Sequence, residues 1–163
     1  MARKVTVTLY QFNELSARAK EKARDWFREA SSGDEWWENV YEDAKQIGLS
    51  ITKFDLQVDK IKGKFTMPAE RAAHVITMEH GKDTDTHKLA TDFLNTRFAF
   101  PQDSEQDEAN EEKAQQFLLD ILGCYLSMLK SELDDINSDY YIDETIRANE
   151  YEFYSDGRRA RDH

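Results

Sequence analysis

Carboxylates are the most frequent chemically active side chains in this sequence, with 33 Asp and Glu against 22 Lys and Arg in 163 residues. Adjacent pairs such as Asp134-Asp135 and Asp143-Glu144 have the residue types for acid–base work or for holding Mg²⁺. In so acidic a chain, however, adjacent carboxylates are expected by chance. The pairs alone therefore predict neither a catalytic centre nor a metal site.

The histidine, cysteine and serine residues give no stronger indication of a metal site or a catalytic site. His74, His80 and His87 are six and seven residues apart, and Cys124 is distant. Two zinc ligands on one helix lie closer than this, about one turn apart, so the spacing does not favour a metal site. Ser127 belongs to no recognisable nucleophile pattern, and neither G-x-x-x-x-G-K nor G-x-G-x-x-G occurs. We therefore expect no catalytic residue, no metal, no cofactor and no enzymatic activity.

The net charge of −11 is distributed unevenly along the chain. Residues 1–100 hold 16 basic and 16 acidic residues, whereas residues 101–156 hold 16 acidic and three basic ones. The last seven residues are net basic. Because the acidic third would repel phosphates, we expect no direct binding of nucleic acid there. Its natural complement is a protein with a basic surface, such as a nucleic-acid-binding protein.

The acidic run "DSEQDEANEE", residues 103–112, carries six carboxylates and no basic residue. One interpretation is a solvated loop leading into the first turns of a helix, where acidic side chains are favourable. The other is a docking face for a basic groove, which together with acids up to Glu144 would imitate the phosphates of a nucleic acid. The candidate partner-binding acids are Asp103, Glu105, Asp107, Glu108, Glu111, Glu112, Asp134 and Asp135.

The segment "DEWWENVYEDA", residues 34–44, contains two adjacent tryptophans among acids. On a helical wheel the apolar residues from Trp36 to Ile47 share one wide stripe, with Trp36 and Tyr41 at its borders. The pattern predicts an amphipathic helix over residues 34–47. Trp36 and Tyr41 are candidate partner-binding residues, because border aromatics are frequent in interfaces.

A long helix near residues 106–136 carries the strongest apolar stripe, which includes Leu118, Ile121 and Leu129. The same wheel places Asp107 and Glu111 inside this stripe. Bare carboxylates cannot be buried there without partners. We therefore expect the part of the helix before Lys113 to project into solvent, fray or meet another chain.

The remaining pattern alternates between strands and helices. The predicted strands cover residues 4–10, 50–58, 60–67 and 150–155, with a hairpin turn near Asp59. The other predicted helices cover residues 14–30, capped by Asn13, residues 68–80, a segment from Asp85, and a short helix capped by Ser138. This order predicts one α+β domain, residues 1–163, with a small antiparallel sheet of three or four strands covered by five or six helices.

Two terminal stretches resemble a family of small proteins encoded by tailed bacteriophages. The first is "YQFNELSARAKEKARDWFREASSGDEWWENVYEDAKQIG", residues 10–48, and the second is "SDYYIDETIRANEYEFYSDGRR", residues 138–159. Many relatives follow the second helix with a glycine-rich segment containing Ser-Gln-Gly-Asp-Gly, whereas this chain has "SITKFDLQVDKIKGKF". The resemblance implies a viral protein that acts on its host, and it assigns no functional residue.

Three functions follow as hypotheses. The first is a non-enzymatic inhibitor that binds a host protein or defence complex, of the anti-CRISPR or anti-restriction type, through the acidic surface. The second is a phage protein with a structural or regulatory role that self-associates as a homodimer. The third is a small hydrolase or nucleotide-modifying enzyme. With no apolar run near the roughly 20 residues of a membrane span, no signal peptide apparent and one cysteine, we expect it in the host cytoplasm.

Overall fold

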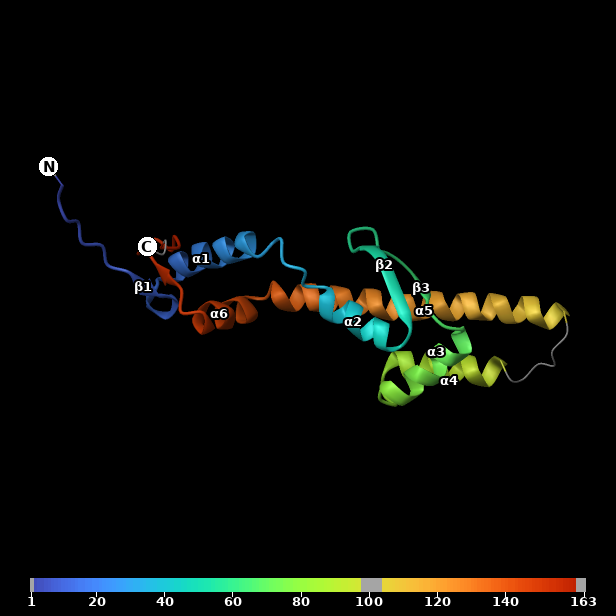
Figure 1. Ribbon diagram of the computed structural model, residues 1–163. Helices are drawn as coiled ribbons and strands as arrows, with labels where there is room; N and C mark the ends of the chain where they lie inside the picture. The colour runs from blue at the N-terminus through green and yellow to red at the C-terminus, as the bar shows by residue number, and fades with distance from the viewer. Residues whose placement is uncertain (1, 98–103, 161–163) are drawn as a thin grey trace. The chain divides into compact units, whose positions relative to one another are not determined.

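The computed structural model describes residues 2–97 and 104–160, and within them the side chains of all residues except 97 and 104–109. The helices are α1 (Ala17–Ala30), α2 (Glu38–Gln46), α3 (Ala69–Glu79), α4 (Asp85–Arg97), α5 (Ser104–Ile136) and α6 (Asp139–Ala148), as Figure 1 shows. The strands are β1 (Tyr10–Gln11), β2 (Leu49–Asp55), β3 (Lys60–Phe65) and β4 (Glu152–Phe153), and a short 3₁₀ turn, η1, covers Phe12–Glu14.

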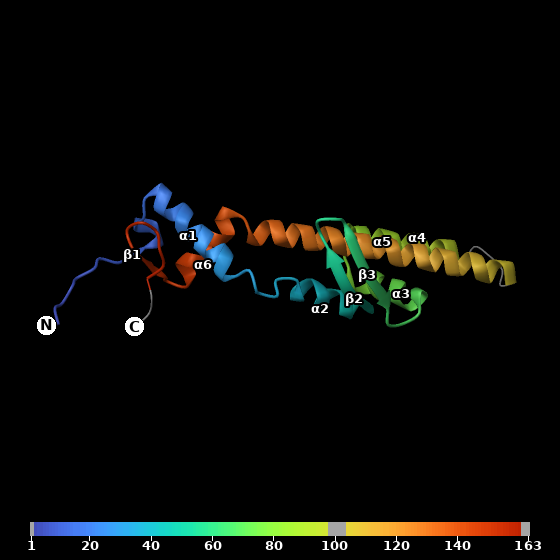
Figure 2. The ribbon, with the colours of Figure 1, turned by 90° about the horizontal axis from the view of Figure 1, so that it is seen from above.

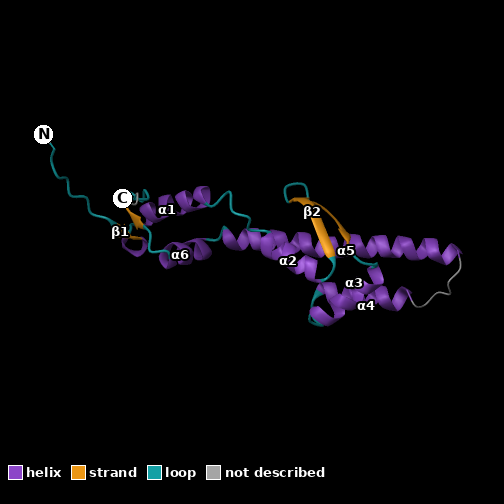
Figure 3. Cartoon of the chain, in the orientation of Figure 1, coloured by secondary structure: helices purple, strands orange, loops and turns teal. Residues whose placement is uncertain are grey.

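The α+β class and the long helix are confirmed (Figure 3). In the described part of the chain the strands divide between two antiparallel pairs, β1 with β4 and β2 with β3, rather than lying in one sheet. The hairpin turn near Asp59 is confirmed, and Asp59 itself has a positive φ of 53°. Ser138 caps α6, since its hydroxyl accepts a hydrogen bond from the Tyr141 amide.

The prediction of a strand over residues 4–10 is wrong for all but its last residue. Only Tyr10 and Gln11 pair, because β4 is two residues long and offers no edge to the residues before Tyr10. The helix that follows is also shorter than predicted. Ser16, rather than Asn13, caps α1 by accepting a hydrogen bond from the Ala19 amide at 3.2 Å.

The described chain divides into two compact units. Unit 1 combines residues 1–35 with residues 133–163, and unit 2 consists of residues 36–132. Unit 1 is therefore built from two stretches of chain that are far apart in the sequence. The expectation of one domain over residues 1–163 stays a prediction.

Unit 2 has the larger apolar core. Ile47, Ile76, Ile121 and Leu129 are completely buried, as the apolar periodicity of their helices requires. The ring of Phe117 stacks on Phe93 and on Phe65 at centroid distances of 4.4 and 5.6 Å. These contacts fix the end of β3 against α4 and α5.

Unit 1 joins α1 to α6 and the β1–β4 pair. Its buried residues are Phe12, Leu15, Ala19, Ala23, Ile142, Ile146 and Phe153. Trp26 makes edge-to-face contacts with Tyr151 and Phe153 at 5.3 and 5.9 Å. The small alanines on α1 allow α6 to approach closely, so two short helices are enough to bury this small apolar core.

Candidate functional site

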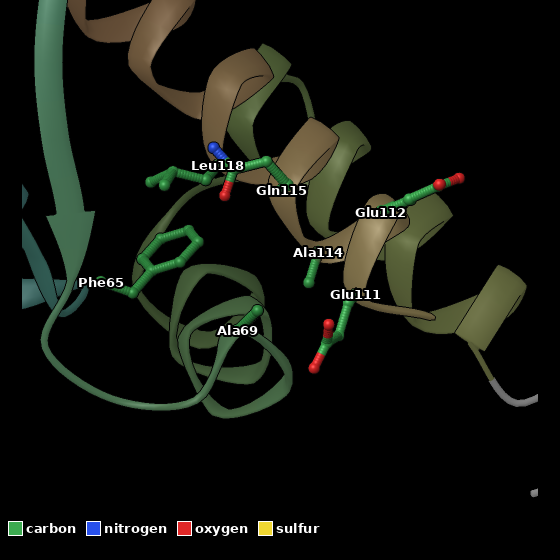
Figure 4. A pocket seen from close by; sticks show the side chains of 7 residues that line it. All are labelled: Phe65, Ala69, Glu111, Glu112, Ala114, Gln115 and Leu118. Atoms are coloured by element: carbon green, nitrogen blue, oxygen red, sulfur yellow. The ribbon is translucent and has the colours of Figure 1, made fainter. Parts of the chain in front are cut away.

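A groove of about 610 Å³ lies in unit 2 between the end of β3, the start of α3 and the first half of α5. It is lined by Phe65, Ala69, Glu111, Glu112, Ala114, Gln115 and Leu118. Figure 4 shows the apolar side chains facing this space and the Glu112 carboxylate pointing away from Phe65. The groove therefore combines an apolar floor with two exposed carboxylates at its rim.

Among the described side chains of the predicted acidic run, those of Glu111 and Glu112 line this groove. Glu111 and Glu112 are both exposed, and for Glu111 this agrees with the expectation that a carboxylate in the apolar stripe of the long helix stays in solvent. Asp103 lies outside the described residues. Glu105, Asp107 and Glu108 fall on α5, where their side chains are not described.

Asp134 and Asp135 are exposed near the end of α5, in unit 1. No described cation forms an ion pair with either of them. Three acids on α6 differ from these two, because each forms an ion pair with an arginine. Asp143 pairs with Arg24, Asp139 pairs with Arg28, and Glu144 pairs with Arg147.

These ion pairs change the electrostatic expectation for the acidic third. Arg24 and Arg28 come from the neutral first hundred residues and lie on α1. They neutralise part of the acidic surface of α6, so Asp139 and Asp143 do not offer unpaired carboxylates to a partner. Among the described candidate acids, Glu111 and Glu112 at the groove rim and Asp134 and Asp135 near the end of α5 form no ion pair with a described cation.

Trp36 and Tyr41 belong to an aromatic cluster. With Trp37 they surround Phe54 of β2 at centroid distances of 5.7–6.1 Å, all in edge-to-face geometry. Trp36 precedes α2, because the helix starts four residues later than predicted. Both candidate side chains are half-buried against the core of unit 2, and burial raises the pKa of Tyr41. Each thus has a structural role whether or not it also meets a partner.

A polar network inside unit 2 has the residue types of a catalytic site. The Tyr125 phenol donates to the Asp43 carboxylate at 2.6 Å, and His80 lies between that carboxylate, at 3.7 Å, and the hydroxyl of Thr86. Tyr125 and Thr86 are buried, and burial is the main cause that raises the pKa of Tyr125. The Thr86 hydroxyl is sealed from solvent, so this geometry satisfies buried polar groups rather than presenting a nucleophile.

Metal ligands do not gather in the described part of the chain, since no group of three or more His, Cys, Asp or Glu side chains there is arranged to hold an ion. Cys124 is half-buried on α5. Burial, followed by the charges of Asp85 and Asp120, raises the pKa of its thiol. A raised pKa keeps the thiol protonated at neutral pH, and the thiolate is the reactive form.

Alkylation of Cys124 by iodoacetamide is therefore expected to be slow in the folded protein at neutral pH. The rate should rise only as the pH passes above the ordinary thiol pKa of 9.0, because the folded state disfavours the thiolate. Mass spectrometry of samples quenched over a pH series gives the rate. The same chain in denaturant is the control. Equal pH midpoints in the two states would show that the fold does not suppress this thiol.

A second, smaller pocket of about 350 Å³ lies in unit 1 and has the opposite charge. Its lining consists of Lys22, Trp26, Gly157, Arg158 and Arg159. One of its cations is already paired, because Asp156 accepts hydrogen bonds from the Arg158 amide and guanidinium. These bonds, that of the amide first, lower the pKa of Asp156.

Sequence reasoning did not identify the groove. The pattern of the long helix places Leu118 in a buried apolar stripe rather than in a groove. The one available signal was the position of Glu111 within that stripe, since a carboxylate there marks where the stripe stops being covered. The meeting of β3, α3 and α5 is a tertiary feature that periodicity does not give.

Comparison of the chain with protein-family models, curated proteins and solved structures finds no match. In the described residues no helix has both the length and the apolar character to cross a bilayer. The geometry of the groove and the charges around it are therefore the basis for assigning a function.

Proposed function

We propose that this chain is a non-enzymatic binding protein of phage origin that acts in the host cytoplasm. Its groove binds a basic, amphipathic segment of a host protein. The segment would place apolar side chains in the groove over Phe65 and Leu118 and its Lys or Arg beside Glu111 and Glu112. The target class is a nucleic-acid-binding host protein or defence complex, of the CRISPR or restriction type. Binding there would block the target in the manner of an inhibitor.

The observation that carries the proposal is the combination of an apolar floor with an acidic rim. An apolar groove alone fits many partners, and an acidic run alone is usually a solvated surface. Together they select a partner segment with cations flanking apolar anchors, which is the way amphipathic helices are recognised in grooves. The resemblance of residues 10–48 and 138–159 to phage proteins supports the viral, host-directed setting.

The ion pairs between α1 and α6 bear on the hypothesis that a partner binds the whole acidic surface of the last third of the chain. A partner drawn by a continuous acidic band would contact α6, yet Asp139 and Asp143 are already paired. Extensive imitation of a nucleic acid is therefore less favoured than a local docking site. The enzyme hypothesis is less favoured too, because the His80 network is closed to solvent at Thr86 and the Cys124 thiol has a raised pKa.

The test uses a synthetic helical peptide with leucines on one face and lysines on its borders as the probe. We expect micromolar binding, and about tenfold weaker binding to the Glu111→Lys/Glu112→Lys double variant. Each reversal removes an attraction and adds a repulsion at the groove rim. Isothermal titration calorimetry at two salt concentrations gives the affinity, and the variant should also show the smaller salt dependence.

The matched control is Asp34→Lys/Glu35→Lys, which makes the same change in net charge at two exposed residues before α2. It should bind the peptide within about twofold of the original chain, because both residues lie outside the groove. Equal losses in the two double variants would mean that the peptide senses only overall charge, and the groove proposal would be wrong. Host proteins that co-purify with the tagged chain can then be compared on the same variants.

A further inference from the structure

The residues before β1 form an extended segment that pairs with no strand in the described part of its own chain. This N-terminal arm, residues 3–9, has the sequence "RKVTVTL". None of its backbone groups makes a hydrogen bond to the described residues, and Val5, Val7 and Leu9 are 71%, 56% and 41% exposed. Figure 2 shows the arm running away from β1 with no strand beside it.

The composition of the arm is that of a strand. Four consecutive residues, Val5 to Thr8, are β-branched, and apolar residues alternate with threonines as a pleated strand requires. Such a segment exposes unpaired N–H and C=O groups together with apolar side chains, which is the usual template for pairing with another chain. The missing component is an edge, since β4 ends after pairing with Tyr10 and Gln11.

We propose that the arm pairs with the arm of a second copy of this chain, antiparallel and centred on Val7, to form a dimer through an intermolecular β-ladder. The proposal is independent of the groove in unit 2. It assigns self-association to residues 3–9.

The arm selects this register by its own pattern. With Val7 opposite Val7 on the two-fold axis, Val5 lies opposite Leu9, so that all three apolar residues of each copy face apolar residues. Moving the centre to Thr6 would set Leu9 opposite Arg3, and moving it to Thr8 would set Val5 opposite Gln11. A shift of the pairing by one residue in either direction would set Val7 opposite a threonine, Thr6 or Thr8.

Charge fits the same register. The arm contains no acidic residue, and its two cations, Arg3 and Lys4, are at one end. In an antiparallel pair these ends lie at opposite extremes of the ladder, so like charges do not meet. Lys4 lies opposite Tyr10, a favourable neighbour for a cation, and Thr6 lies opposite Thr8. A closed two-fold contact of this kind stops at a dimer.

The first test is the mass in solution, measured by sedimentation over a concentration series. The full chain should pass from monomer to dimer with rising concentration, and Val7→Lys should weaken dimerisation at least about 100-fold. It removes the central apolar pair and sets two lysines face to face. Thr6→Lys is the matched control, because it adds the same charge at the neighbouring residue. Its side chain lies opposite Thr8, so it does not set two lysines face to face. The control should dimerise within about tenfold of the original chain.

The second test reads the register directly in a Cys124→Ser background. Val7→Cys should form an interchain disulfide on mild oxidation, because opposite residues of a ladder have the separation that a disulfide needs. Thr6→Cys alone and Thr8→Cys alone should remain uncrosslinked, whereas a mixture of the two should crosslink. A chain that stays monomeric throughout, a dimer that tolerates Val7→Lys, or equal crosslinking at residues 6 and 7 would each overturn the proposal.

Discussion

Replacing Asp143 with alanine is expected to destabilise unit 1 by about 3 kcal/mol, the first of the two largest effects that we predict for single substitutions. Asp143 accepts two hydrogen bonds from Arg24, from Nε at 2.7 Å and from Nη2 at 2.9 Å. Both side chains are only 15% exposed. The variant would leave the Arg24 guanidinium in a largely buried place without its carboxylate.

Two observations set this magnitude. The hydrogen bonds that Arg24 donates to Asp143 raise the pKa of Arg24 above its already high ordinary value, although burial opposes them. A guanidinium keeps its proton in proteins even without such a partner, so in the variant the cation cannot escape the cost by losing its proton. Glu21 also pairs with Arg24 and remains in the variant. It compensates part of the charge, which keeps the expected loss at the lower end of the range for broken buried ion pairs.

The neighbouring pair of Arg28 and Asp139 is the control, because it joins the same two helices in solvent. Its side chains are 31% and 59% exposed, so Asp139→Ala should cost no more than about 1 kcal/mol. Urea unfolding followed by circular dichroism gives both values. Equal losses from the two substitutions would mean that burial does not distinguish these ion pairs.

Replacing Gly157 with alanine is expected to cost about 3 kcal/mol, the second large effect. Gly157 has a φ of +92°, where a β-carbon is strained, and that carbon would lie 2.1 Å from the backbone oxygen of Ala19. The obstacle is backbone rather than a flexible side chain, so α1 or the turn after β4 must move.

Gly33→Ala is the matched control for Gly157→Ala. Gly33 also lies in unit 1, and a β-carbon there would meet no atom within 4 Å. Its substitution should change the free energy of unfolding by no more than about 0.5 kcal/mol. If thermal and urea unfolding place the two alanine variants at the same stability, the close approach of the turn to α1 is not a constraint.

The helices could be predicted from the sequence because each carries its own evidence. The stripe of α5 from Leu118 to Leu129 has the helical period, and Ser138 before α6 is a local capping signal. The strand at residues 4–10 carried equally good local evidence, yet only its last residue pairs. A strand requires a partner as well as a pattern, and the partner is set by tertiary structure.

The net charge of each part of the chain could be predicted from the sequence, but the ion pairs could not. Counting charges gives the acidic last third, yet the pairing of Arg24 with Asp143 joins residues 119 positions apart. Pairs of this kind depend on which helix faces of unit 1 meet. Similarly, the groove needs Phe65 and Leu118 from separate elements, so no local pattern in the sequence marks it.

The two-part construction of unit 1 has a consequence for synthesis on the ribosome. Residues 36–132 emerge as one uninterrupted stretch and can fold while translation continues. Helix α1 emerges earlier, but Ile142, Ile146 and Phe153, which cover its alanine face, are translated more than a hundred residues later. During that interval the nascent α1 is exposed to chaperones and proteases, and premature termination between residues 132 and 142 would leave it permanently uncovered.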